Sequence, residues 1–195
     1  MTSSYDTIGR PVGRAEGPDK VTGQAMFPAD VNLPGTLVGK CLRSPFPYAK
    51  IVSIDPNSVA AARQVPGVHA VLTTDDILSH LVGRMLRDMP ILARDVVRFA
   101  GQKVVAVAAE NDDIAEEALN LIQIEYEEME PILDPSDSIK TGAPVLHPDF
   151  ADYTGTPDGA QAYPNAAGHG SRSHGDVEQG FAESEPLLEL SFKTT

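Results

Sequence analysis

The chain has 195 residues, of which 42% are hydrophobic, and a net charge of −13. This acidity argues against nucleic acid and anionic membranes as partners, because phosphate binding needs clustered Lys and Arg. Cys41 is the single cysteine, so the chain can form neither an internal disulfide nor a thiolate metal site of its own.

The N-terminus is polar and carries no targeting pattern. Residues 1–14 lack an apolar core behind positive charge, and Arg10 and Arg14 are too far apart for a twin-arginine signal. No apolar run approaches the roughly 20 residues that span a bilayer. We therefore expect a cytoplasmic protein without membrane contact.

Residues 1–22 are rich in Gly and Pro, which predicts an extended arm rather than a helix. Beyond the arm, strand-like alternation and short apolar runs are separated by helix signals. The predicted strands cover residues 37–43, 50–55, 69–73, 95–99, 104–109 and 123–127. The predicted helices cover residues 57–64, a short one opening at 74–77, and one from a cap at 111–113 to residue 122.

Three local signals support these elements. Asp55-Pro56 combines a cap acceptor with a proline in the first turn, which is typical of a helix start. The run 104–109 is almost wholly apolar and predicts a central strand buried on both faces. The helix after Asn111 has one apolar stripe at helical spacing, made of Ile114, Ala118, Leu121 and Ile122.

After about residue 149 the composition changes. Residues 153–174 are dense in Gly, Pro, Ala, Ser and Asn, which indicates a long surface segment or linker. A short helix is predicted at 176–183, and alternation at 187–193 predicts a final strand. Such a strand must pair with a strand of this chain or of another one.

The alternation of strands and short helices indicates either an α/β or an α+β fold. We divide the chain into an extended arm (1–22), one main domain (23–135), and a Gly/Pro-rich linker that leads into a strand (136–195).

Short motifs spread along the chain carry a family resemblance. In order they are Ile8-Gly-Arg-Pro-Val12, Asp19-Lys-Val-Thr-Gly23, Ala29-Asp30, Leu33-Pro-Gly35, Arg43-Ser-Pro45, Ala49-Lys-Ile51, Pro66-Gly-Val68, Val97-Arg98, Gly101-Gln102, Ala115-Glu-Glu-Ala118, Ile124-Glu-Tyr-Glu-Glu128, Gly175-Asp-Val-Glu178, Phe181-Ala182 and Phe192-Lys-Thr194. Their order and spacing resemble the N-terminal part of the large, molybdopterin-binding subunits of the xanthine dehydrogenase/aldehyde oxidase (molybdenum hydroxylase) family.

The resemblance implies an α/β hammerhead fold, which we place in the α+β class, with a mixed sheet and short helices. It also implies three partners: a 2Fe-2S subunit, an FAD subunit, and the remainder of the molybdopterin-binding subunit. Family members hydroxylate aldehydes, aromatic compounds or N-heterocycles with oxygen from water, and one branch removes a phenolic hydroxyl reductively. Substrate and direction are left open by this chain.

Two departures limit what the resemblance transfers. Relatives often have histidines after the Arg-Ser-Pro motif, where this chain has Phe46 and Tyr48. The family's catalytic glutamate, and the glutamine near molybdenum, belong to a region beyond the residues matched here. We therefore assign no catalytic, cofactor-binding or metal-binding residue.

The glycines, histidines and carboxylates of the chain also form no pattern that predicts a catalytic, cofactor or metal site. The glycines between Gly9 and Gly17 lack the preceding strand and following helix of a dinucleotide site. His169 and His174 lie in the Gly/Ser-rich segment, without the rigid frame of a metal site. The clustered carboxylates, such as Glu125 and those following it, fit solvated faces better than an acid/base pair.

Two segments are candidate interfaces. Arg43-Ser-Pro-Phe-Pro-Tyr48 combines a cation, two aromatic rings and rigid prolines, so Arg43, Phe46 and Tyr48 are candidate anchors. An ordinary edge turn explains the same segment equally well. Arg10 is the candidate in the arm, which could dock on a neighbouring subunit.

Two functions remain open at this level. In the first, the chain is a structural and assembly portion of a molybdopterin-dependent oxidoreductase whose catalytic domains lie elsewhere. In the second, it is a free-standing ligand-binding or regulatory module on a hammerhead scaffold, which fold alone does not exclude. Pairing of the strand 187–193 within the chain would favour the free-standing module, and pairing with another chain would favour the assembly role.

Overall fold

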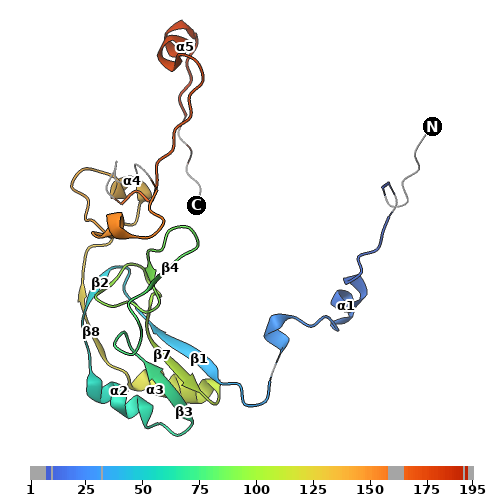
Figure 1. The fold of residues 1–195 in the computed structure, drawn as a ribbon, viewed down its shortest axis with the longest axis vertical. Coiled ribbons are helices and arrows are strands. Elements are labelled where there is room, and N and C mark those ends of the chain that lie inside the picture. Colours follow the sequence, from blue (N-terminus) through green and yellow to red (C-terminus); the bar gives the residue numbers. More distant parts are fainter. Residues whose placement is uncertain (1–7, 10, 32, 158–164, 191, 193–195) are drawn as a thin grey trace.

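The computed structural model describes residues 8–9, 11–31, 33–157, 165–190 and 192. The strands are β1 (Val38–Arg43), β2 (Ala49–Ile54), β3 (Val68–Leu72), β4 (Leu81–Val82), β5 (Met89–Pro90), β6 (Val96–Val97), β7 (Lys103–Ala109) and β8 (Ile124–Glu128). The helices are α1 (Gly17–Thr22), α2 (Pro56–Arg63), α3 (Asp112–Leu121), α4 (Pro135–Ser138) and α5 (Val177–Glu183), with two 3-10 turns, η1 (Pro28–Asp30) and η2 (Phe150–Asp152). Figure 1 shows the α1 and α5 segments extending away from the sheets.

The described strands form three sheets, ordered β1-β7-β3, β6-β2-β8 and β4-β5. Every pairing is antiparallel, which corrects the mixed sheet expected from the sequence. A helix that crosses between two strands produces a parallel pair only when both strands join one sheet. Here β2-α2-β3 and β7-α3-β8 each begin in one sheet and end in the other. The α+β class itself is confirmed.

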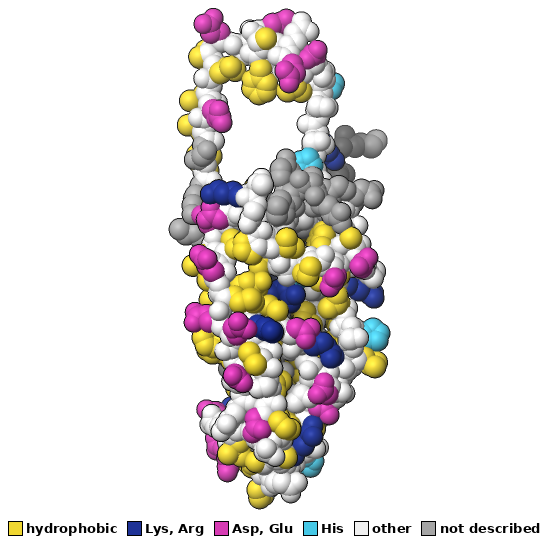
Figure 2. Space-filling model, turned by 90° about the vertical axis from the view of Figure 1, so that its left-hand side faces the viewer, with side chains coloured by type: hydrophobic (Ala, Val, Ile, Leu, Met, Phe, Trp, Pro, Cys, Tyr) yellow, Lys and Arg dark blue, Asp and Glu magenta, His cyan; other side chains and the backbone are white. Residues whose placement is uncertain are grey.

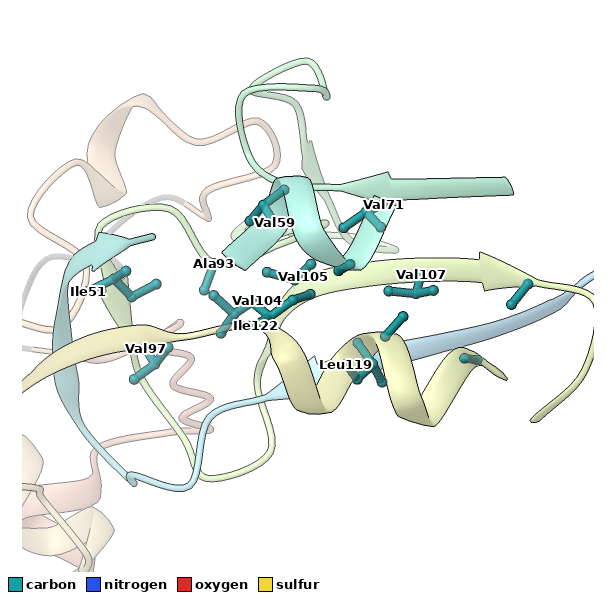
Figure 3. Close-up of a cluster of buried hydrophobic side chains, with 14 of the residues drawn as sticks. Ile51, Val59, Val71, Ala93, Val97, Val104, Val105, Val107, Leu119 and Ile122 are labelled. Atoms are coloured by element: carbon teal, nitrogen blue, oxygen red, sulfur yellow. The ribbon is translucent and has the colours of Figure 1, made fainter. Parts of the chain in front are cut away.

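The two larger sheets share one hydrophobic core, shown in Figure 3. Its buried members are Ala49, Ile51, Val59, Ala62, Val71, Ala93, Val97, Val104, Val105, Val107, Ala109, Ala115, Ala118, Leu119 and Ile122. Strand β7 lies between β1 and β3, and its consecutive residues Val104 and Val105 are fully buried. Burial of successive residues on opposite faces confirms the predicted central strand.

Both main helices begin at the predicted caps. The Asp55 carboxylate accepts hydrogen bonds from the backbone N–H groups of Asn57 and Ser58 at the start of α2. The Asn111 side chain accepts one from the Ile114 N–H at the start of α3. These bonds satisfy N–H groups that have no partner inside a helix, so local sequence was sufficient to place both starts.

The arm is not extended throughout, in contrast to the expectation from its composition. Residues 17–22 form α1, with Pro18 in its first turn and Gly23 at its end in a left-handed conformation with φ 73°. The Thr22 hydroxyl also donates to the Pro18 carbonyl, 2.8 Å away. Proline at the start and glycine at the end are helix boundary signals that the overall Gly/Pro content obscured.

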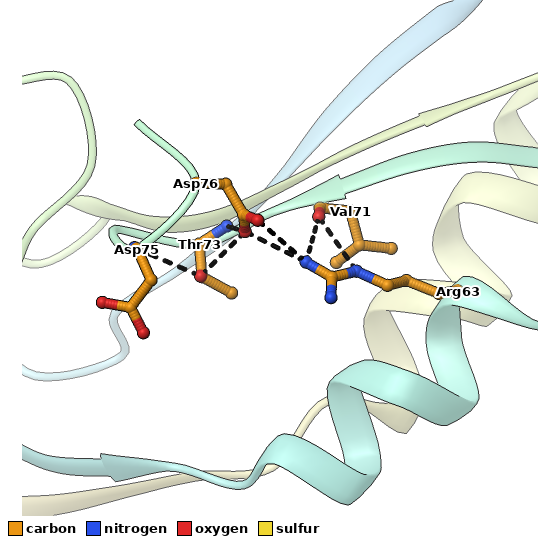
Figure 4. Close-up of polar contacts among 5 residues, drawn as sticks. All are labelled: Arg63, Val71, Thr73, Asp75 and Asp76. Atoms are coloured by element: carbon orange, nitrogen blue, oxygen red, sulfur yellow. Dashed lines mark hydrogen bonds and ion pairs between the residues drawn. The ribbon is translucent and has the colours of Figure 1, made fainter. Parts of the chain in front are cut away.

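The helix predicted to open at residues 74–77 does not form; a turn replaces it. Figure 4 shows the reason: the Asp76 carboxylate accepts from the Thr73 N–H and hydroxyl and from the Arg63 guanidinium, which also donates to the Val71 carbonyl. These contacts lower the pKa of Asp76, chiefly through the Thr73 N–H. Asp76 therefore caps a turn after β3 rather than entering a helix.

The last predicted strand is also not observed. Helix α5 forms as expected, with the Asp176 carboxylate accepting from the Gln179 N–H. Residues 187–190 and 192, however, pair with no strand in the described part of the chain. The α5 segment stands apart from the rest as an open loop in Figure 2. Without a neighbouring strand, the alternating pattern cannot form ladder hydrogen bonds.

Candidate interface

The turn after β1 is anchored to the turn before β7. The Ser44 N–H donates to the Gln102 carbonyl, and the Gly101 N–H donates to the Ser44 carbonyl, both at 2.8 Å. The buried Ser44 hydroxyl accepts from the Phe46 N–H at 3.0 Å. Two turns far apart in sequence are thus held as one rigid edge.

The three predicted interface residues that the structure describes occupy different environments. Arg43 is exposed, and its Nη1 donates to the Gly101 carbonyl at 2.9 Å. Phe46 points inward instead: its ring packs on Tyr126, with centroids 5.3 Å apart, and against the core. Tyr48 is half-buried and lines a surface cavity. Arg10 lies outside the described residues. An interface role for these residues stays a prediction.

Two cavities adjoin this edge and meet at Phe99. The first, of about 220 Å³, is lined by Pro47, Tyr48, Arg98, Phe99, Ala100, Pro131, Ile132, Leu133 and Leu146. The second, of about 190 Å³, is lined by Arg43, Val82, Met89, Pro90, Ile91, Phe99, Gly101, Gln102 and Lys103. Phe99 is 49% exposed and Leu133 82% exposed, so both cavities have exposed apolar rims.

The sequence pattern predicted a strand over residues 95–99 and therefore did not indicate that Phe99 lies at the surface. The strand β6 is only two residues long, and Phe99 lies beyond it, in the turn that the Gln102 side chain closes. The Gln102 Oε1 accepts from the Arg98 N–H at 2.6 Å. The adjacent Gly101 was the available signal that the strand ends early.

Arg98 joins this edge to the segment after the main domain. Its Nε donates to the Leu146 carbonyl at 2.7 Å. The neighbouring His147 ring lies edge-on to Tyr153, with Nδ1 3.2 Å from the tyrosine hydroxyl. Burial lowers the pKa of His147, and the Arg98 charge lowers it further against the opposing effect of Asp88. These surroundings therefore favour the neutral form of His147.

Lowering the pH should weaken the contact between His147 and Tyr153. Because the folded pKa of His147 lies below its ordinary value of 6.5, its contribution to stability is complete above pH 6.5 and is lost as pH falls through the lowered pKa. Urea unfolding of the wild type and of His147→Gln between pH 8 and pH 5 measures the difference. Parallel pH profiles for the two proteins would contradict the assignment.

Asn165 also holds the segment around Leu146 in place. Its Oδ1 accepts from the Leu146 N–H at 2.7 Å, and its Nδ2 donates to the carbonyls of Ser138 and Pro144. The residue has a left-handed backbone with φ 56°, which asparagine tolerates better than most side chains. In this loop the Asn165 side-chain amide thus bonds to three backbone groups that are not paired in a helix or a sheet.

Asn165→Gly should release this loop while keeping the left-handed backbone. Losing the three bonds should cost about 1–3 kcal/mol locally. Amide hydrogen exchange at Leu146 should accelerate by about tenfold or more, while the amides of β7 keep their rates as an internal control. An unchanged Leu146 rate would show that the Asn165 amide does not hold the loop.

Metal-ligating side chains are not clustered in the described residues. No group of three or more His, Cys, Asp or Glu side chains among them could hold a metal ion. A further cavity, of about 240 Å³, is lined by three carboxylates and two guanidinium groups, with apolar residues between them. Nor does any helix within the described ranges combine the length and apolarity needed to traverse a bilayer.

A comparison with known protein families identifies the domain that contains the two larger sheets. Residues 22–130 match the family described as "Aldehyde oxidase and xanthine dehydrogenase, a/b hammerhead domain". The chain belongs to this family. The hammerhead domain accordingly includes both larger sheets, helices α2 and α3, and the edge formed by the Ser44 and Gly101 turns.

Individual members of the family align well beyond the hammerhead domain. A probable xanthine dehydrogenase subunit of Bacillus subtilis is 37% identical over 92% of this chain and 22% of its own length. The nicotinate dehydrogenase large molybdopterin subunit of Eubacterium barkeri is 31% identical over 100% of this chain and 42% of its own length. The chain thus spans less than half of either relative.

A solved structure agrees with the fold. Carbon monoxide dehydrogenase from Oligotropha carboxidovorans superposes with a TM-score of 0.66 at 33% identity, over 74% of this chain and 18% of that protein chain. The hammerhead fold expected from the sequence motifs is therefore confirmed.

Proposed function

We propose that the chain is the structural and assembly portion of the large subunit of a molybdopterin-dependent oxidoreductase. The observation that carries the proposal is the alignment of nearly the whole chain with a much longer member of the family. The reaction would be hydroxylation of an aldehyde, aromatic or N-heterocyclic substrate, or reductive dehydroxylation. Its catalytic groups would lie outside this chain, and the complex would be cytoplasmic.

The chain's own residues do not match the 2Fe-2S cluster that such an enzyme uses. A 2Fe-2S cluster is held by four Cys, or by two Cys and two His, and the sequence has a single cysteine, Cys41, which is only partly buried. The described residues therefore do not fit that cluster, and we assign them no chemical step that involves the cluster, molybdopterin or FAD. In the proposed complex these groups belong to the partner subunits and the remainder of the large subunit.

The exposed apolar side chains at both ends of the described chain support assembly over a free-standing module. Large apolar residues remain more than half exposed before β1 and from α5 onward: Ile8, Val12, Val21, Met26, Phe27, Val31, Leu33, Phe181, Leu187, Leu188, Leu190 and Phe192. Apolar surface of this extent is typical of regions that another protein surface covers. Residues 187–190 also find no strand partner among the described residues.

Purification of the chain from its native host at natural expression level tests the proposal. We expect it to elute with subunits that contain molybdopterin, 2Fe-2S and FAD, identified by mass spectrometry and metal analysis. Elution of the chain alone at its own mass of 20.8 kDa would overturn the proposal and favour the free-standing module.

A further inference from the structure

The two cavities that meet at Phe99 differ in charge from the rest of the chain. The sequence has 28 acidic residues against 15 Lys and Arg. The described lining of the two cavities contains Arg43, Arg98 and Lys103 but no carboxylate. We call this combined lining the Phe99 surface. In an acidic protein, a basic and apolar surface of this kind favours a negatively charged partner.

Two of the three cations are available to such a partner. Arg98 is engaged with the Leu146 carbonyl. Arg43 uses one guanidinium N–H on the Gly101 carbonyl, which fixes the group at the rim and leaves other donors of the fork for a carboxylate. Lys103 is exposed at the start of β7. Neither Arg43 nor Lys103 forms an ion pair with the described residues.

The apolar part of the surface is suited to side-chain anchors. Met89 and Ile91 are each 48% exposed beside one cavity, and Leu133 is exposed beside the other. Volumes of about 190 and 220 Å³ are smaller than the roughly 300 Å³ at which small-molecule pockets begin. An apolar side chain of a partner protein can enter on each side of Phe99. Aromatic and Arg residues are also enriched where protein interfaces bind most strongly.

We infer that the Phe99 surface docks an acidic segment of a partner subunit, in which Asp or Glu residues flank one or two large apolar side chains. The inference rests on the proposed function, because it takes the partner from the same complex. A phosphate polymer or an anionic bilayer fits less well, since an extended row of phosphates needs clustered Lys and Arg, whereas this surface offers two available cations beside small apolar cavities.

Zero-length carbodiimide cross-linking of the purified native complex tests the inference directly. The reagent joins a lysine amine to a carboxylate in contact with it, so mass spectrometry should find Lys103 linked to an Asp or Glu of a partner subunit. Lys20, on the arm, is the comparison lysine. A complex that yields Lys20 links but none from Lys103, or Lys103 links only to a second copy of this chain, would overturn the inference.

Charge reversal adds a quantitative test. The double variant Arg43→Glu/Lys103→Glu should weaken binding of the partner subunit by about tenfold or more, and reversal of the cross-linked partner carboxylate to Lys should restore it. Arg172→Glu, an exposed cation elsewhere, is the matched control. If the double variant binds as the wild type does, the inference fails while the proposed function stands. If the wild type binds no partner, both fail.

Discussion

Val104→Asp is expected to remove the cooperative folded state of the domain. Val104 is fully buried in β7, the middle strand of its sheet, and belongs to the core that both larger sheets share (Figure 3). An unpaired carboxylate at such a position costs several kcal/mol, which is comparable with the roughly 5–15 kcal/mol that stabilises a whole domain. Val104→Ala, which only deletes two methyl groups, should cost about 2 kcal/mol.

Urea unfolding followed by circular dichroism measures both variants. Val52→Asp is the matched control, because it makes the same change at a β2 valine that is 48% exposed. That control should stay within about 1 kcal/mol of the wild type. A Val104→Asp protein that keeps a cooperative transition close to that of Val52→Asp would show that β7 is not the centre of the core.

Local signals were sufficient wherever the deciding contacts lie close in sequence. The caps Asp55 and Asn111 bond to N–H groups two or three residues away, so both helix starts were predicted correctly. The run 104–109 also identified the central strand, because a strand covered on both faces must be apolar on both. These elements fix most of the core.

Predictions failed where a distant residue decides the local structure. Residues 74–77 have the composition of a helix start, yet Arg63 from α2 and the Thr73 N–H hold Asp76 in a turn. The sheets became antiparallel because each helix connects strands of different sheets, which periodicity does not reveal. The apolar residues at 187–190 predict a strand, but a strand also needs a neighbour to supply its hydrogen bonds.

The candidate interface was predictable only in part. The sequence drew attention to Arg43 and Tyr48, which do lie at the two cavities. It did not separate them from Phe46, whose ring is directed to Tyr126 and the core. Phe99 becomes a surface residue through the early end of β6, and its place between two cavities depends on side chains up to about residue 146. Such a surface follows from tertiary packing alone.

Gly155→Ala is expected to detach the loop between β4 and β5 from the segment that contains η2. Gly155 has φ 90°, and a Cβ there would lie 1.9 Å from the Met85 carbonyl oxygen. In the native fold the neighbouring Arg87 N–H donates to the Thr154 carbonyl at 2.9 Å. Neither backbone can yield without breaking this bond, so we expect a local loss of about 3 kcal/mol or more.

Gly142→Ala separates this clash from backbone strain. Gly142 has nearly the same φ, 88°, but a Cβ there meets no atom within 4 Å. Left-handed strain alone should therefore cost about 1–2 kcal/mol at either position. Hydrogen exchange at the Arg87 amide should accelerate strongly in Gly155→Ala and remain native in Gly142→Ala. Equal losses of stability in the two variants, with the Arg87 amide still protected, would mean that the loop and the segment do not approach as closely as the structure shows. A larger loss in Gly155→Ala instead assigns the difference to backbone contact between two segments that lie about 70 residues apart in sequence, a contact that only a residue without a Cβ permits.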